Sequence, residues 1–120
     1  LDDHSADPLA RRALRVSMGN AFHVPHSRVS DVAGFVASLN AEGVATIALT
    51  PGSDAVPLRE VRIDQPRRLL LFGSEREGLD TNVMSACTHR VRIEMQEGVD
   101  SLNVAVTAGV LLFEAVRQRG

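Results

Sequence analysis

Two glutamates lie in a short segment, residues 73–78, that has glycine at both ends. Glycine has no Cβ, so its backbone can approach a flat ligand closely or adopt a positive φ angle. The carboxylates of Glu75 and Glu77 could accept hydrogen bonds from hydroxyl or amine groups of such a ligand. The same composition also fits an ordinary turn with solvated acids. The segment is therefore a candidate ligand loop whose role depends on what surrounds it.

A second candidate is the polar start of the last predicted helix, which contains Ser101 and Asn103. Ser101 is most simply the residue that caps this helix, because a serine hydroxyl accepts a hydrogen bond from an unpaired amide of the first turn. We expect Asn103 inside the first turn of a buried helix, where a polar side chain needs a partner. Asn103 could hold a neighbouring loop or contact a ligand.

The other potential nucleophiles and metal ligands carry little signal. The chain has one cysteine, Cys87, and four histidines, none of which has zinc-like spacing with the cysteine. We therefore predict no metal site and no internal disulfide, and we expect a reducing, cytoplasmic compartment. Cys87 is expected to fill a small buried space, while His23 and His26 are expected at the surface. No nucleophile elbow, phosphate-binding P-loop or dinucleotide-binding glycine motif is present.

The 120-residue chain is nearly neutral, with 13 arginines, no lysine, 15 acidic residues and a net charge of −2. This balance excludes a strongly basic nucleic-acid-binding surface over the whole chain. Arg11, Arg12 and Arg15, and Arg67 with Arg68, could form local patches for phosphate or could simply be solvated. No apolar run reaches the roughly 18 residues that a membrane span needs, so we expect no membrane partner.

Helical and extended hydrophobic patterns alternate along the chain, which favours an α/β domain with a mostly parallel sheet flanked by helices. The patterns predict strands at residues 21–24, 44–49, 68–72 and 89–93. They predict helices at residues 8–16, 30–43, 80–86 and 101–118. The alternation in residues 89–93 is typical of a half-exposed or edge strand. The last helix is apolar on nearly every side, so we expect it to be buried within the domain or at a subunit contact.

Three predicted loops follow strands and precede helices or turns: residues 50–54, 73–78 and 95–101. Open α/β sheets bind ligands at the carboxyl ends of their strands, where such loops meet. We therefore predict that these three loops form one ligand site.

Three segments resemble the SpoU (TrmH-like) RNA ribose 2′-O-methyltransferases of the SPOUT superfamily. Residues 69–79, LLLFGSEREGL, resemble the family's second motif, an apolar strand that leads into G-x-E-x-x-G-L. Residues 93–95 and 99–106 resemble the third motif, I-P-M followed by S-L-N-V-S/A. Residues 7–19 resemble the D-P-x-x-x-R-x-x-R-x-S-x-G stretch between the first and second motifs. The segments occur in the family's order and cover nearly all of the chain.

The resemblance implies transfer of a methyl group from S-adenosylmethionine to a ribose 2′-hydroxyl of ribosomal or transfer RNA. It also implies a homodimer, and a C-terminal segment that threads through a loop as a trefoil knot, so that the apolar last helix is knot core and dimer surface. Glu75, Ser101 and Asn103 would organise the catalytic centre. The implied cofactor pocket consists of Leu49, Thr50, Phe72, Gly73, Glu75, Gly78, Ile93, Met95, Ser101, Leu102, Asn103 and Val104.

The chain also departs from the family pattern. The first motif, N-x-G-x-x-x-R, is absent, and its arginine is the residue credited with positioning or activating the ribose hydroxyl. We therefore expect residues 1–120 to be a SpoU-type domain truncated at its N-terminus, without the first strand and helix, and inactive as a fragment. Glu94 replaces the usual proline, and Glu97 stands where a glycine is common.

Two other functions stay open. The chain could be a catalytically silent RNA-binding or dimerisation module with a vestigial cofactor pocket. It could also be an unrelated nucleotide-binding α/β domain that uses residues 73–78. Binding of S-adenosylmethionine separates the first of these from an active enzyme.

Overall fold

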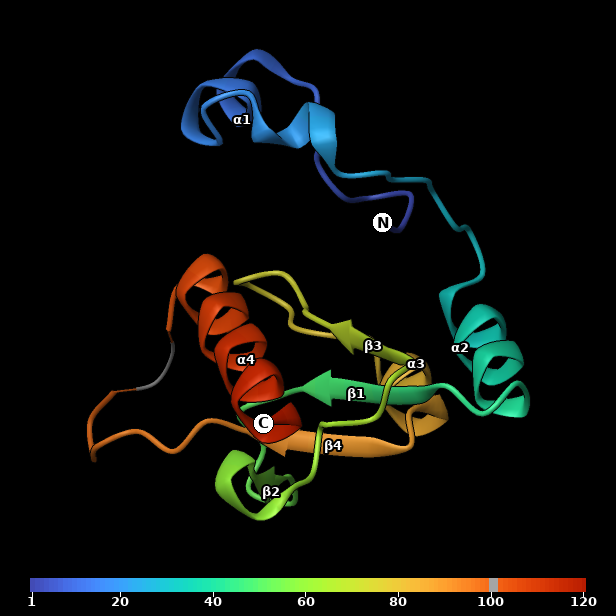
Figure 1. Cartoon of the computed structure of the whole chain (residues 1–120), viewed down its shortest axis with the longest axis vertical. Helices are drawn as coiled ribbons and strands as arrows, with labels where there is room; N and C mark the ends of the chain where they lie inside the picture. The colour runs from blue at the N-terminus through green and yellow to red at the C-terminus, as the bar shows by residue number, and fades with distance from the viewer. Residues whose placement is uncertain (100–101) are drawn as a thin grey trace. The chain divides into compact units, whose positions relative to one another are not determined.

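The structure is a computed structural model that describes residues 1–99 and 102–120. The chain forms two compact units, Leu1–Val32 and Ala33–Gly120, and each is described here by itself (Figure 1). The prediction of a single domain for residues 1–120 stays a prediction.

The first unit contains a short helix, α1 (Arg11–Val16), and a 3-10 turn, η1 (Asn20–His23). The predicted strand at residues 21–24 is wrong, because this segment forms η1. Gly19 has a φ of 79° and reverses the chain, and the amide of Phe22 then donates to the Gly19 carbonyl at 3.1 Å. These local hydrogen bonds satisfy the backbone without a strand partner. His23 and His26 are exposed, as predicted.

The second unit is built on a four-stranded sheet with the order β2-β4-β1-β3. Every neighbouring pair is parallel, which confirms the predicted parallel α/β architecture. The strands are β1 (Ala45–Leu49), β2 (Val56–Pro57), β3 (Arg68–Leu71) and β4 (His89–Arg92). Of the two alternatives predicted for residues 89–93, the half-exposed strand agrees with β4, in which Val91 is buried and Arg90 is exposed. The edge strand is wrong, because β4 lies between β1 and the unpredicted β2.

One face of the sheet packs against the last helix, α4 (Val104–Arg119). The core on this face contains Ile47 of β1, Val91 of β4 and Leu111 of α4, each fully buried. Complete burial of such a side chain contributes about 1.5–3 kcal/mol. The short 3-10 turn η2 (Leu58–Glu60) and the segment that follows it close the same core through Leu58, Val61 and Ile63.

Helix α4 corrects two predictions. Its N-cap is Asn103, whose side-chain oxygen accepts a hydrogen bond from the amide of Ala105 at 2.9 Å. Asn103 is therefore not inside the first turn, and Ser101, the predicted cap, lies outside the described residues. The second correction is that α4 is not buried all round within the domain: its buried residues, Thr107, Leu111 and Ala115, form a single stripe. The alternative of a subunit contact stays a prediction. One helix face meets one sheet face, so the remaining apolar side chains of α4 stay exposed.

The opposite face of β1 carries a buried polar cluster. Thr46 is fully buried, and its hydroxyl donates to Asn40 Oδ1 at 2.6 Å and accepts from the Thr88 amide at 2.9 Å. Asn40 in turn donates to the carbonyl of Ala86 at 2.6 Å. These contacts connect β1 to α2 (Val32–Ala41) and to the end of α3 (Thr81–Ala86). Asp80 caps α3 as predicted, accepting from the Asn82 amide at 2.8 Å.

Candidate functional site: a pocket at the carboxyl ends of the strands

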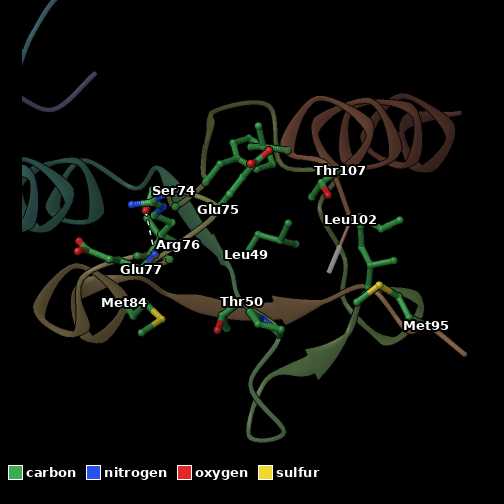
Figure 2. A pocket seen from close by; sticks show the side chains of 17 residues that line it. Leu49, Thr50, Ser74, Glu75, Arg76, Glu77, Met84, Met95, Leu102 and Thr107 are labelled. Carbon is green, nitrogen blue, oxygen red and sulfur yellow. Dashed lines mark hydrogen bonds between the residues drawn. The ribbon is translucent and has the colours of Figure 1, made fainter. Parts of the chain in front are cut away.

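A pocket of about 530 Å³ lies where β1, β3 and β4 end (Figure 2). This volume falls within the range of roughly 300–1,000 Å³ that is typical of small-molecule sites. The three loops that were predicted to converge each contribute to its wall. Its lining consists of Leu49, Thr50, Pro51, Phe72, Gly73, Ser74, Glu75, Arg76, Glu77, Gly78, Leu79, Met84, Ile93, Met95, Leu102, Val104 and Thr107.

The loop of residues 73–78 forms one wall and is closed on itself. The amide of Gly78 donates to the Ser74 carbonyl at 3.0 Å, and the amide of Glu77 donates to Ser74 Oγ at 3.1 Å. Gly78 has a φ of 70°, a left-handed conformation that favours glycine. The loop doubles back so tightly that a Cβ on Gly73 would overlap the backbone of Gly78 and Leu79. Both bounding glycines therefore have conformational reasons to be glycine.

The second wall begins where β1 ends. The amide of Thr50 donates to the Val91 carbonyl at 3.0 Å, which fixes Thr50 beside β4. Its hydroxyl then accepts a hydrogen bond from the Gly52 amide at 3.3 Å. The position of Thr50 in this wall is thus set by one contact with the neighbouring strand β4 and one contact within its own loop.

The third wall comes from the end of β4 and the start of α4. Ile93 and Met95 follow β4, and Leu102 and Val104 flank the helix cap. Leu102 is 38% exposed and Val104 is 40% exposed, so apolar surface faces the opening. In Figure 2, Leu49 and Thr50 lie between the acidic loop on one side and Met95 with Leu102 on the other.

The pocket combines apolar walls with a charged rim. Phe72, Ile93 and Met95 offer a surface on which a flat heterocycle can pack. Glu75 and Glu77 are exposed carboxylates that can accept hydrogen bonds from hydroxyl or amine groups. Chemically, the arrangement suits a nucleoside-like molecule with an uncharged ring and polar or cationic substituents.

Most of the residues predicted to bind the cofactor line this pocket: Leu49, Thr50, Phe72, Gly73, Glu75, Gly78, Ile93, Met95, Leu102 and Val104. Asn103 is not among the lining residues, because its side chain caps α4. Ser101 lies outside the described residues. Glu75 lines the pocket, and its predicted catalytic role stays a prediction.

Sequence reasoning missed Met84 of α3 and Thr107 of α4, which also line the pocket. Each belongs to a helix with a packing role, and nothing in its local sequence marks it as a site residue. Cys87, one turn beyond Met84, is half-buried and donates from Sγ to the Val83 carbonyl at 3.2 Å. Burial raises the pKa of the Cys87 thiol, so this side chain behaves as the predicted space filler.

Within residues 1–99 and 102–120, no three or more His, Cys, Asp or Glu side chains gather in a way that could hold a metal ion. None of the helices in these same ranges is both long enough and apolar enough to cross a membrane.

The fold and the pocket define the class of the protein. It is an α/β domain with a parallel sheet and a mixed apolar and acidic pocket at the carboxyl edge, where open α/β sheets bind ligands. A sequence profile described as the SpoU rRNA Methylase family matches residues 1–113. The chain belongs to this family.

Three similar proteins agree with this assignment. A protein of Mycobacterium bovis named as an uncharacterized tRNA/rRNA methyltransferase is 41% identical over 114 residues, which is 93% of this chain and 40% of that protein. The 23S rRNA (guanosine-2′-O-)-methyltransferase RlmB of Vibrio parahaemolyticus is 32% identical over 98% of this chain and 46% of its own length. An AdoMet-bound rRNA methyltransferase from Sinorhizobium meliloti superposes with a TM-score of 0.87 at 30% identity, over 98% of this chain and 44% of that one. The chain thus spans less than half the length of each.

Proposed function

We propose that the protein transfers a methyl group from S-adenosylmethionine to a ribose 2′-hydroxyl of ribosomal or transfer RNA. The observation that carries the proposal is the meeting of the second and third motif segments, with residues 49–51, in one pocket. The Sinorhizobium relative, described as AdoMet-bound, supports the choice of methyl donor. The Vibrio relative, named as a guanosine 2′-O-methyltransferase, supports the choice of ribose.

The pocket fits this donor in size and chemistry. Leu49, Phe72, Ile93, Met95 and Leu102 supply apolar surface for the adenine ring. Gly73 keeps the acidic loop folded close to the ring site, since any side chain there would displace Leu79. The carboxylate of Glu75 would accept hydrogen bonds from hydroxyl or amine groups of the donor.

When bound, the donor supplies a methyl group on a sulfonium sulfur, a good leaving group. The task left to the protein is to align the ribose oxygen with that methyl carbon and to exclude water. Glu75, exposed at the pocket rim, is our candidate for orienting or accepting the hydroxyl proton. Ser101 stays a predicted participant. We assign Asn103 a supporting role, because its cap sets the helix end that carries Leu102 and Val104.

We further propose a homodimer that uses the outer surface of α4. Val106, Leu112, Phe113 and Val116 are 53%, 57%, 70% and 62% exposed, and apolar surface of this kind is typical of subunit contacts. A trefoil knot at the C-terminal segment is part of the same proposal. Light scattering tests the dimer: Phe113→Arg should halve the measured mass, whereas Arg119→Glu at the helix end should leave it unchanged.

The test of the methyl transfer uses the protein expressed from its complete gene, tritiated donor and bulk ribosomal and transfer RNA. Alkali cleaves RNA wherever a free 2′-hydroxyl can attack the adjacent phosphate, so a methylated ribose survives in a dinucleotide. We expect tritium in alkali-stable dinucleotides. Tritium in mononucleotides would indicate methylation of a base and would contradict the proposal.

Calorimetry with S-adenosylmethionine decides between an enzyme and a silent module. We expect saturable binding that Glu75→Gln weakens and that Glu60→Gln, at an exposed acid outside the pocket lining, leaves unchanged. An absence of donor binding together with retained RNA binding would instead support the silent module.

A further inference from the structure

The connection between β1 and β2 is short, because Leu49 at the end of β1 and Val56 at the start of β2 lie level with the same residue of β4, Val91. Strand β4 lies between β1 and β2 (Figure 1), so the chain must cross β4 to pass from one to the other. Only six residues, 50–55, separate the end of β1 from the start of β2. A crossover that returns along the sheet usually needs a dozen or more residues and contains a helix, whereas this one only passes β4. This segment, the 50–55 crossover, has no helix to hold it.

Two arginines of β4 contact the 50–55 crossover. The guanidinium of Arg92 donates from Nη1 to the Ser53 carbonyl at 3.3 Å and to the Ala55 carbonyl. The guanidinium of Arg90 forms an ion pair with the Asp54 carboxylate, with an Nη1–Oδ2 distance of 3.1 Å. Three consecutive residues of the crossover are therefore bound by side chains of one strand.

The register of β4 explains why both arginines reach the same segment. Val91 is fully buried in the core beneath α4. Successive side chains of a strand point to opposite faces, so Arg90 and Arg92 both point to the face away from α4. A flexible crossover on that face would leave carbonyl groups without partners, and Nη1 of Arg92 donates to two of them.

The crossover also begins as a wall of the pocket, since Thr50 and Pro51 line it. Contacts at residues 53–55 fix the far end of a segment whose near end is fixed by the hydrogen bond from the Thr50 amide to Val91. Thr50 is itself the near anchor, and Pro51 lies between the two. Their positions relative to Ile93 and Met95 thus depend on both.

We propose that Arg90 and Arg92 are positioning residues that clamp the 50–55 crossover onto β4 and thereby hold the Thr50–Pro51 wall of the pocket in its binding geometry. Arg92 is the stronger of the two, because it is half-buried and donates to two carbonyls. Arg90 and Asp54 have side chains that are 47% and 64% exposed, so solvent screens their attraction. The effect on the methyl donor rests on the function proposed above, whereas the clamp itself does not.

The clamp is tested first by amide hydrogen exchange on the protein without ligand. The amides of Thr50, Gly52 and Ala55 are each hydrogen-bonded, and they report on the crossover. We expect Arg92→Ala to speed their exchange by at least about tenfold, with the amides of β1 unchanged. Arg67→Ala is the matched control, because it removes an exposed arginine that pairs with Glu42 at 3.2 Å outside the pocket.

Calorimetry with S-adenosylmethionine is the second readout. Loss of charge-assisted hydrogen bonds should weaken donor binding by about tenfold in Arg92→Ala. The change should be about twofold or less in Arg90→Ala, and Arg67→Ala should bind as the wild type does. In steady-state assays KM for the donor should rise while kcat changes little. Arg92→Lys should give an intermediate affinity, because an ammonium on a flexible stem keeps the charge but lacks the rigid planar geometry of the guanidinium.

If Arg92→Ala does not fold, Arg92→Lys and the reversed pair Arg90→Asp with Asp54→Arg replace it. The reversed pair should restore the wild-type exchange that Arg90→Asp alone loses. Unchanged exchange at residues 50–55 in the Arg92 variants would overturn the clamp. Faster exchange with unaltered donor affinity would overturn its link to the pocket. A wild-type protein that binds no donor would defeat the proposed function, and the exchange data would still decide the clamp.

Discussion

The backbone of Gly73 lies directly against the backbone nitrogen of Leu79, with no space between them for a Cβ. This approach brings the two ends of the acidic loop together at the pocket. Substitution Gly73→Ala should therefore open the loop or displace Leu79, at a cost of about 1–3 kcal/mol in unfolding free energy. We expect donor affinity to fall at least about tenfold in calorimetry.

Gly109 provides the matched control for that substitution. It lies in α4, and a Cβ there would meet no atom within 4 Å. Gly109→Ala should leave donor binding intact and raise helix stability by up to about 1 kcal/mol. Equal losses of affinity in the two variants would show that the close approach at Gly73 is irrelevant.

Two substitutions at Asn103 distinguish its structural role as the cap of α4 from a catalytic role. Asn103→Ala should destabilise the protein by about 1 kcal/mol in urea unfolding, because the Ala105 amide loses its acceptor. Asn103→Ser should retain most of the stability and most of the methyl transfer. If Asn103→Ser keeps the stability but loses transfer, the amide has a chemical role beyond the cap.

The polar cluster at Thr46 should contribute strongly to stability. Thr46→Val leaves Asn40 Oδ1 and the Thr88 amide without the partner that each has now. Each unsatisfied buried group costs about 1–3 kcal/mol, so the urea midpoint should fall markedly. Thr81→Val, at an exposed threonine of α3, should change the midpoint little. A small effect at Thr46 would mean that water replaces the lost contacts.

Glu114 should give the protein an acid-sensitive component of stability. Its carboxylate accepts from Arg117 Nη2 at 2.6 Å and Nε at 2.7 Å, and from Gln118 Nε2 at 2.8 Å. The hydrogen bonds from Arg117, followed by that from Gln118, lower the pKa of Glu114 from 4.5 to about 2. A carboxyl whose pKa is lower in the folded state stabilises above its unfolded pKa and loses that contribution as pH falls through its folded pKa.

The corresponding measurement is the melting temperature of wild type and Glu114→Gln between pH 6 and pH 2. The difference between the two proteins should be largest above pH 4.5 and should shrink as the pH approaches about 2. Other acidic groups titrate in both proteins and cancel in the difference. A difference that is constant over this range would contradict the assignment.

Much of the sheet and of the pocket could be predicted because the relevant signals are local. The apolar strands that became β1 and β3 are compact runs, and Asp80 is a capping residue before a helical pattern. The two glycines of the acidic loop signal a tight turn. Parallel strands place their following loops at one edge of the sheet, so the meeting of the three loops followed from the α/β pattern alone.

The remaining features depend on tertiary partners. Strand β2 has only two residues, one of which is Pro57, and proline argues against a strand except at an edge. Without β2, β4 looked like an edge strand. The exposed flank of α4 has the same residue types as its buried stripe, so composition could not tell which side meets the sheet. Asn103 and Ser101 are both good capping residues, so residue type alone could not tell which of them caps α4.

The strand order also determines when the molecule can be completed during synthesis. β2 pairs with β4, and the arginines that bind the segment before β2 belong to β4 as well. On a nascent chain, residues 50–57 leave the ribosome about 35 residues before Arg92, which corresponds to roughly 2–7 s at ordinary translation rates. Throughout that interval the segment lacks the strand that it pairs with in the folded protein, so its backbone groups are open to chaperones or to incorrect partners. Arg90 and Arg92, which we propose to fix the pocket wall in the mature protein, thus belong to the strand whose synthesis lets residues 50–57 pair.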